Sequence, residues 1–483
     1  MTKFVRNFLK HIMNYGVATI ITGIGSFILI PIYTRYLTPS DYGIVDLMNT
    51  TSNLLSMFLA LGLNAAFSVY YYSSKSTDEI KEYFSTIINV IMVFSLIIIG
   101  TLVATNNMSP HGFIKNVPKF YLNISFLSSG FTVFIQFPMS ILQYKEKSKQ
   151  YGLFSIFQFL ISTVLNIIFV VFLKKGAEGI IISQLVVSIM FFIIAATLSK
   201  NIYCLHIDFS KMKNLLRVGI PVIPHAMAGW CITFVDRIII NNYVDTNSLG
   251  IYSFGYKIGT IMLVIVSAIN QAWSPIFMKT ANDKKEVAKQ IFNNINRYYI
   301  FAVGIFALIL SLFSKEIATL LAPKTYLNAY YIMPFIFISY FFNGLYFMIV
   351  NSLFYSRKTY FLPISTGLAA IINVMLNLIF VPIYGIYAAA VVNLITYIVL
   401  FTCVYIINLK IYKINMPIST IIIYLSINTL VVFSMIKLNI SWLTIIIKIC
   451  LTIIIICLLY YISINKKERI KTKQFLLKVL NKV

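Results

Sequence analysis

Charged residues are the scarcest feature of this chain of 483 residues. Only 11% of the residues are Asp, Glu, Lys or Arg, whereas 59% are hydrophobic. A soluble protein carries about a quarter charged residues. The composition therefore excludes a soluble enzyme, a disordered chain and a coiled coil, and it predicts a protein whose main solvent is the lipid bilayer.

Acidic residues are rarer than basic ones, and cysteines are few. The 14 Asp+Glu against 39 Lys+Arg give a formal net charge of +25. In a membrane protein this excess belongs to cytoplasmic loops beside anionic headgroups, so no nucleic acid partner is expected.

The five cysteines include no CxxC pair, so we expect no disulfide and no zinc or other metal site. No GxxxxGK[ST] loop is present, which excludes an ATP-driven pump for this chain alone.

Long apolar runs dominate the remaining sequence. A membrane-spanning helix needs roughly 20 apolar residues, and the chain holds about fourteen such runs. They predict an all-α integral membrane protein with spans near 11–34, 43–72, 84–105, 118–143, 151–173, 177–199, 215–241, 248–278, 292–313, 326–350, 360–382, 385–408, 416–436 and 441–463. The connections are short and leave no room for a soluble domain. Pro221 and Pro224 near the start of the span at 215–241 are expected to break or kink it.

The basic residues predict the orientation of these spans. With the N-terminus inside, about three quarters of the 39 lysines and arginines fall in the loops on the inner side. We therefore expect a multi-pass protein of the bacterial cytoplasmic (inner) membrane with both termini in the cytoplasm. The first apolar run is too long for a cleaved signal peptide.

An internal repeat relates the two halves of the chain. Residues 36–44 read YLTPSDYGI and residues 243–251 read YVDTNSLGI, and residues 140–170 also align without gaps on residues 351–381. An even number of spans per repeat gives two lobes of the same orientation, related by an axis along the membrane normal. The predicted organisation is a six-helix lobe at 1–205, a second at 206–412, a helix pair at 413–465 and a basic cytoplasmic tail at 466–483.

Polar residues form matching stripes in two spans that the repeat relates. Asp46, Asn49, Thr50, Asn53 and Asn64 share one face of the span at 43–72. The equivalent span carries Ser253, Tyr256, Lys257, Thr260, Ser267 and Gln271. Such residues either bond helices together or line a polar cavity, and the presence of Asp46 and Lys257 favours the cavity.

Charged side chains inside spans are the sharpest signals for function. Asp236 and Arg237 are adjacent, so on a helix they point about 100° apart, and we expect no simple pairing between them. Lys448 is expected to extend to the outer surface, whereas Lys257 on the polar stripe suits a phosphate-bearing substrate. Asp236 is a candidate ligand, with Asn373 and Asn377, for a coupling Na⁺ or H⁺; the alternative is a structural pair with Lys257.

The stretch FILIPIYTRYLTPSDYGIVDL at 27–47 resembles the first-span signature of the bacterial polysaccharide flippases. These are Wzx-type members of the superfamily of multidrug, oligosaccharidyl-lipid and polysaccharide exporters. GIPVIP at 219–224 and QAWSPIFMK at 271–279 are similar to further segments of that family. The resemblance extends over about residues 10–410.

The resemblance implies two six-helix lobes with a final helix pair. It also implies the export of an undecaprenyl-pyrophosphate-linked oligosaccharide for O-antigen, capsule or related surface polysaccharide, through a basic cavity and with coupling to an ion gradient. No catalytic residue and no cofactor are expected, apart from a coupling H⁺ or Na⁺, and polysaccharide polymerase machinery is an expected partner. The candidate substrate-binding residues are Lys257, Arg237, Arg35, Asn49, Asn53, Tyr256, Thr260 and Gln271. The candidate ion-coupling residues are Asp236, Asp46, Asn373 and Asn377.

Two other functions stay open. A cation-coupled multidrug or toxin extruder needs an apolar or acidic cavity, and the basic bias of the charges inside the spans argues against it. A membrane polysaccharide polymerase or acyltransferase needs catalytic acids or histidines, often in long external loops, and the external loops here are short.

Overall fold

The computed structural model describes residues 21–463 except 111, 115, 284–285 and 436. These residues form helices joined by short connections, with no strand among them. Within this part of the chain, 12 helices are long and apolar enough to cross a membrane, or 13 if one bent pair is counted as a span. The all-α membrane fold is confirmed. The span predicted at 11–34 lies partly outside the described residues, so the count of about fourteen stays a prediction.

The chain forms two compact units. Unit 1 comprises Met1–Ser253, Leu321–Tyr326 and Val381–Gly385, and unit 2 comprises Phe254–Leu320, Leu327–Phe380 and Ile386–Val483. These units are defined by contacts, whereas the predicted lobes are defined by the repeat. The lobe boundaries stay a prediction.

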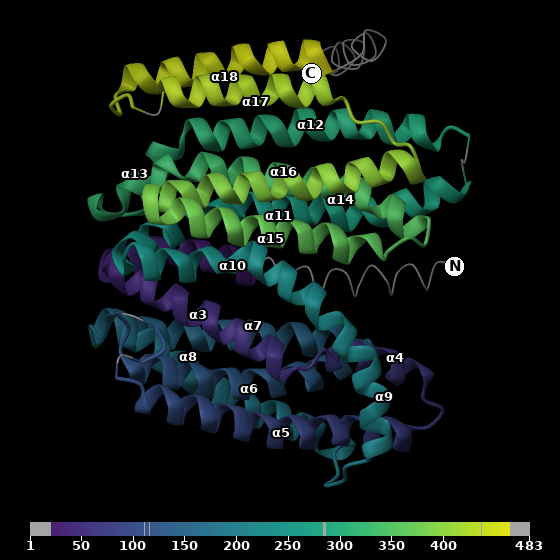
Figure 1. The fold of residues 1–483 in the computed structure, drawn as a ribbon. Coiled ribbons are helices and arrows are strands. Elements are labelled where there is room, and N and C mark those ends of the chain that lie inside the picture. The colour runs from purple at the N-terminus through teal and green to yellow at the C-terminus, as the bar shows by residue number, and fades with distance from the viewer. Residues whose placement is uncertain (1–20, 111, 115, 284–285, 436, 464–483) are drawn as a thin grey trace. The chain divides into compact units, whose positions relative to one another are not determined.

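Unit 1 contains the helices up to the start of α11 (Figure 1). In this unit α6 packs on α3, α5 and α8, and α4 packs on α9. Its elements are α2 (Ile30–Tyr36), α3 (Pro39–Leu59), α4 (Leu63–Ser73), α5 (Thr77–Met108), α6 (Lys119–Tyr144), α7 (Ser148–Ile167), the π-helical η1 (Ile168–Phe172), α8 (Gly176–Ser199), the 3-10 turn η2 (Lys200–Ile202), α9 (Phe209–Gly219), the 3-10 turn η3 (Ile220–Val222) and α10 (Ile223–Tyr243).

Unit 2 contains most of α11 and the helices that follow it. Here α14 packs along α16, and α12 packs on α14 and on the last two helices, α17 and α18. The elements are α11 (Thr246–Asp283), α12 (Ala288–Leu312), α13 (Ser314–Leu321), the 3-10 segment η4 (Lys324–Tyr331), α14 (Met333–Tyr355), α15 (Phe361–Tyr384), α16 (Ile386–Ile411), α17 (Ile418–Met435) and α18 (Trp442–Ser463).

The span predicted at 43–72 is broken. α3 ends at Leu59 and α4 begins at Leu63, and the two helices are bent by 44°. Gly62 at the break has φ +68°, a left-handed conformation that glycine adopts without steric cost, and a Cβ there would meet the carbonyl oxygen of Gly219 at 2.1 Å. The predicted stripe is therefore not continuous: Asn64 lies on α4, where its amide donates to Gln136 at 2.6 Å.

The predicted break at Pro221 and Pro224 is confirmed. α-Helical structure ends at Gly219, the 3-10 turn η3 follows, and α10 starts at Ile223 with Pro224 in its first turn. Proline fits the first turn of a helix because the amide hydrogen it lacks would have no partner there. The break sets the start of α10, which carries Asp236 and Arg237.

Candidate functional site

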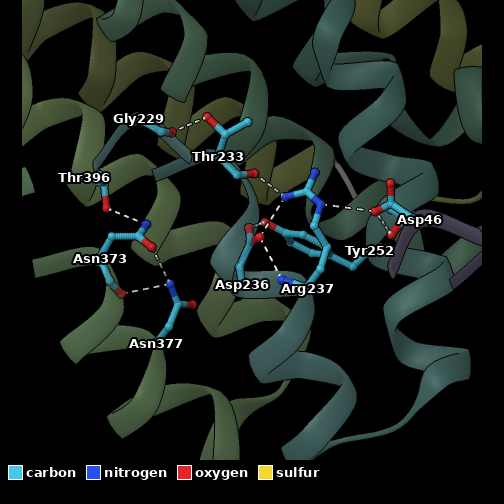
Figure 2. Close-up of polar contacts among 10 residues, drawn as sticks. Asp46, Gly229, Thr233, Asp236, Arg237, Tyr252, Asn373, Asn377 and Thr396 are labelled. Carbon is cyan, nitrogen blue, oxygen red and sulfur yellow. Dashed lines mark hydrogen bonds and ion pairs between the residues drawn. The ribbon is translucent and has the colours of Figure 1, made fainter. Parts of the chain in front are cut away.

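The candidate site is a buried charged cluster in unit 1, formed by Asp46 on α3, Asp236 and Arg237 on α10, and Tyr252 and Ser253 on α11 (Figure 2). Arg237 is at its centre and only 3% exposed. Its Nε lies 3.1 Å from Oδ2 of Asp46, and its Nη1 lies 2.7 Å from Oδ1 of Asp236. One guanidinium therefore contacts two carboxylates from different helices.

A capping box positions Asp46. The Thr38 hydroxyl accepts a hydrogen bond from the backbone of Asp41, and the Asp41 carboxylate accepts one from the backbone of Thr38, each at 3.1 Å. This reciprocal pair, with Pro39 in the first turn, starts α3 at a defined residue. Asp46 follows two turns into the helix.

Two glycines bring α3 and α11 together. A Cβ on Gly43 would meet the backbone oxygen of Thr246 at 2.3 Å and the backbone nitrogen of Gly250 at 2.7 Å. A Cβ on Gly250 would meet the carbonyl oxygen of Pro39 at 1.6 Å. Only glycine permits backbones to approach this closely. About one turn further along, the Ser253 hydroxyl donates to Oδ2 of Asp46 at 2.6 Å.

These contacts join residues that the repeat makes equivalent. The alignment of 36–44 with 243–251 pairs Gly43 with Gly250, and its continuation pairs Asp46 with Ser253. Equivalent residues meet where two copies cross on a two-fold axis. The arrangement of the two lobes about an axis stays a prediction.

The remaining bonds of the cluster satisfy Asp236 and orient Arg237. The Tyr252 hydroxyl donates to Oδ2 of Asp236, and Nη1 of Arg237 also donates to the carbonyl oxygen of Thr233. The guanidinium lies 5.1 Å from the ring centroid of Phe234 and 5.8 Å from that of Tyr252. Hydrogen bonds and ring contacts of this kind partly offset the cost of burying charge.

The expectation that Asp236 and Arg237 do not pair is wrong. Their Cβ atoms do point in different directions, but the arginine side chain is long enough to curl back along α10, and Nη1 reaches the neighbouring carboxylate at 2.7 Å. The direction of the Cβ atom on a helix does not fix where the end of a long side chain lies.

The expectation for Lys448 is also wrong. Lys448 on α18 is 1% exposed, and its Nζ lies 2.6 Å and 2.9 Å from the two carboxylate oxygens of Glu316 on α13. The ammonium also lies 5.7 Å from the ring centroid of Phe313. Pairing inside unit 2 replaces extension to the surface, because α13 places a carboxylate beside the buried lysine.

The other candidate residues fall into separate groups. In unit 1, Arg35 is exposed at the end of α2, and Asn49 and Asn53 line a polar cavity. In unit 2, Lys257 and Thr260 are half-buried on α11, Tyr256 is buried with its ring against Tyr340, and Gln271 is exposed. The Thr260 hydroxyl donates to the carbonyl oxygen of Lys257 at 2.6 Å.

The two asparagines of α15 bond to each other. Asn377 donates to the side chain of Asn373 at 3.1 Å, and Asn373 donates to the Thr396 hydroxyl on α16 at 2.9 Å. Within the described part of the chain, Oδ1 of Asn377 is a buried acceptor without a hydrogen-bond partner. Asp236 belongs to unit 1 and these asparagines to unit 2, so their grouping around one cation stays a prediction.

Sequence reasoning missed three polar partners: Tyr252, Gln184 and Glu316. The amide of Gln184 on α8 donates to Oδ1 of Asn49 at 2.9 Å. The single glutamine in the largely apolar run at 177–199 was a usable signal for this contact. Tyr252 and Glu316 gave no comparable signal, because tyrosine is common throughout the spans and Glu316 lies in a connection.

Comparisons with known proteins agree with the sequence signature. A family model described as "Polysaccharide biosynthesis protein" matches residues 8–281, and one described as MatE matches residues 221–379. The chain is 25% identical to the Lsg locus putative protein 1 of Haemophilus influenzae, over 72% of this chain and 85% of the relative. It is 23% identical to the capsular polysaccharide biosynthesis protein CapF of Staphylococcus aureus, over 64% and 76%.

Solved transporter structures share the fold. The lipid II flippase MurJ, in an inward closed conformation, superposes with a TM-score of 0.74 at 17% identity, over 93% of this chain and 98% of MurJ. An inward-facing multidrug resistance MATE family transporter of the MOP superfamily gives 0.61 at 14% identity, over 83% and 99%.

Proposed function

The chain belongs to the polysaccharide biosynthesis protein family, and from that premise we propose that it is a flippase for a lipid-linked oligosaccharide. The substrate is an undecaprenyl-pyrophosphate-linked repeat unit, which moves from the inner to the outer leaflet of the bacterial cytoplasmic membrane. The flippase fold of MurJ and the relative named for capsular polysaccharide biosynthesis support this choice.

The charged cluster at Arg237 is the observation that carries the proposal. An ionised side chain at the centre of a membrane helix costs on the order of 2.5–3.5 kcal/mol on insertion scales. This cluster holds three charged side chains within helices, and replacement of a buried ion pair by hydrophobic residues is often neutral or stabilising. Charged residues kept inside membrane helices are typical of transporters, in which they mark ion and substrate pathways.

The charge balance of the cluster suits a coupling cation. With both carboxylates ionised, Arg237, Asp46 and Asp236 carry one excess negative charge, and arginine does not lose its proton. One H⁺ or Na⁺ neutralises this excess. The Asp46 side chain is 27% exposed and the Asp236 side chain 3%, so Asp46 is the carboxylate that a cation reaches.

Cation binding at Asp46 then changes the contact between α3 and α10. A neutralised Asp46 loses its ion pair with Arg237, and α3 and α11 stay together through the close contact of Gly43 and Gly250. Weakening one helix contact while another is kept permits the rigid-body rocking of alternating access. Lys257 on α11 remains the candidate cation for the pyrophosphate.

Transport in reconstituted vesicles tests both roles. Asp46→Asn should abolish gradient-driven movement of lipid-linked oligosaccharide, while Asp78→Asn, a change to an exposed residue at the start of α5, should leave it unchanged. Lys257→Ala should lose transport, and Lys257→Arg should retain part of it because arginine also bonds phosphate. Normal gradient dependence in both Asp46→Asn and Asp236→Asn would refute the coupling role.

A multidrug extruder is the second candidate, favoured by the MatE match and the MATE transporter fold. Vesicles that export a cationic dye against a gradient but do not move lipid-linked oligosaccharide would establish this alternative.

A further inference from the structure

Unit 1 contains an open polar cavity of about 420 Å³ between α3, α6, α7 and α8. Its volume lies within the range of small-molecule sites, about 300–1,000 Å³. Among the residues that the structure describes, its lining consists of serine, threonine, asparagine and glutamine with Phe159 and Val187, and it includes no charged residue. A wall so rich in hydroxyls and amides is unusual inside an apolar helix bundle.

The hydroxyls of the wall present acceptors to the cavity. Ser128 donates to the carbonyl oxygen of Ile124 at 2.9 Å, Thr132 to that of Ser128 at 2.8 Å, and Ser155 to that of Tyr151 at 3.1 Å. Each hydroxyl has one donor and two acceptor lone pairs. Because the O–H of each of these hydroxyls donates within its own helix, the oxygen lone pairs remain as acceptors for a ligand.

Two amides on opposite helices are held in place by each other. Nε2 of Gln184 on α8 donates to Oδ1 of Asn49 on α3 at 2.9 Å. This bond leaves the amide hydrogens of Asn49 as donors and the carbonyl oxygen of Gln184 as an acceptor. The wall therefore combines fixed donors and acceptors, with Asn53 and Gln158 adding further amides.

Phe159 on α7 supplies one aromatic face in this polar lining. The faces of an aromatic ring carry partial negative charge. These faces attract the weakly positive C–H groups on the face of a saturated ligand ring whose polar groups lie at its edge.

We infer that this cavity binds a neutral sugar. A sugar ring supplies several hydroxyl donors for the acceptors of Ser128, Thr132 and Ser155, and its C–H face packs on Phe159. Cation sites are usually built with carboxylates and anion sites with basic residues, and the described lining has neither; a lipid chain favours a wholly apolar wall, whereas Phe159 and Val187 are the only apolar residues of the described lining. The inference rests on the proposed function, in which the sugar belongs to the transported oligosaccharide.

Protection of an introduced thiol tests the site directly. The native cysteines at 204, 231, 403, 450 and 457 lie outside the described lining and are replaced by alanine, and Ser155→Cys then places a thiol in the cavity. The purified protein is labelled with a small water-soluble thiosulfonate in the presence of glucose, galactose or N-acetylglucosamine. At a sugar concentration about ten times Kd, occupancy should slow labelling about tenfold for at least one sugar. Labelling of Ser73→Cys, an exposed control on α4, should not change.

A matched pair of variants ties protection to the cavity wall. Gln184→Leu should remove the protection by sugar, and Gln143→Leu, at an exposed position on α6, should keep it. Thermal unfolding of both variants checks that each is folded. Protection by Na⁺ without protection by any of the three sugars, or equal labelling under all conditions, would overturn the inference.

The assay separates this inference from the proposed function because labelling needs no transport. Absence of protection in a protein that still moves lipid-linked oligosaccharide refutes the sugar site alone. Protection in a protein that moves none refutes the proposed function and leaves the site.

Discussion

At the residue scale, Arg237 is the residue on which the charged cluster depends. Arg237→Leu leaves Asp46 and Asp236 without their shared counter-charge, and breaking a buried pair in this way costs about 3–5 kcal/mol. We expect a marked fall in the thermal stability of the detergent-purified protein. Arg35→Leu removes an exposed arginine and should change the free energy of unfolding by less than about 0.5 kcal/mol. Equal effects of the two variants would contradict the buried pairing.

The buried pair of Lys448 and Glu316 gives a second prediction at this scale. Lys448→Met should destabilise the protein by on the order of 2 kcal/mol, less than for a fully buried pair because the Glu316 side chain keeps 17% exposure. The exchange Lys448→Glu with Glu316→Lys should restore most of the loss, since it returns opposite charges to the same two positions. A double-mutant cycle of thermal unfolding measures the coupling, and additive single effects would show that the two residues do not pair.

At the element scale, the close contact between α3 and α11 depends on glycine. Gly250→Ala places a Cβ 1.6 Å from the carbonyl oxygen of Pro39, a backbone atom that moves only with its helix, so we expect a loss of at least about 1–3 kcal/mol. Gly229→Ala on α10 is the matched control, because a Cβ there meets nothing within 4 Å. It should gain about 0.5–1 kcal/mol, the usual advantage of alanine inside a helix. Comparison of the two unfolding temperatures checks the contact, and a Gly250→Ala variant as stable as the parent would exclude it.

At the scale of the whole molecule, the orientation follows from the loops. Reporters fused after Lys147, after Lys213 and at the C-terminus should report cytoplasm, and reporters fused after Asn107 and Asp245 should report the outside. The physical reason is the basic excess, which holds positively charged short loops on the cytoplasmic side. Two reversed sites would contradict both the span assignment and the predicted repeat.

The amino-acid sequence by itself determined the lipid environment, the positions of most spans and the family signature. Hydropathy and charge are sums over local stretches, and a helix in lipid must satisfy its own backbone hydrogen bonds. The same local reasoning predicted the break at Pro221 and Pro224. It also marked Asp46, Asp236 and Arg237 as unusual, since a charge inside a span is visible without any knowledge of its neighbours.

Only the tertiary structure decided which polar groups meet. The pairing of Asp236 with Arg237 depends on how a long side chain bends, and the pairing of Lys448 with Glu316 depends on where α13 places its carboxylate relative to α18. The polar cavity needs four helices, and the bond between Asn49 and Gln184 joins residues far apart in the chain. Packing between helices is set by side-chain shape over the whole unit, whereas helical periodicity describes one helix at a time.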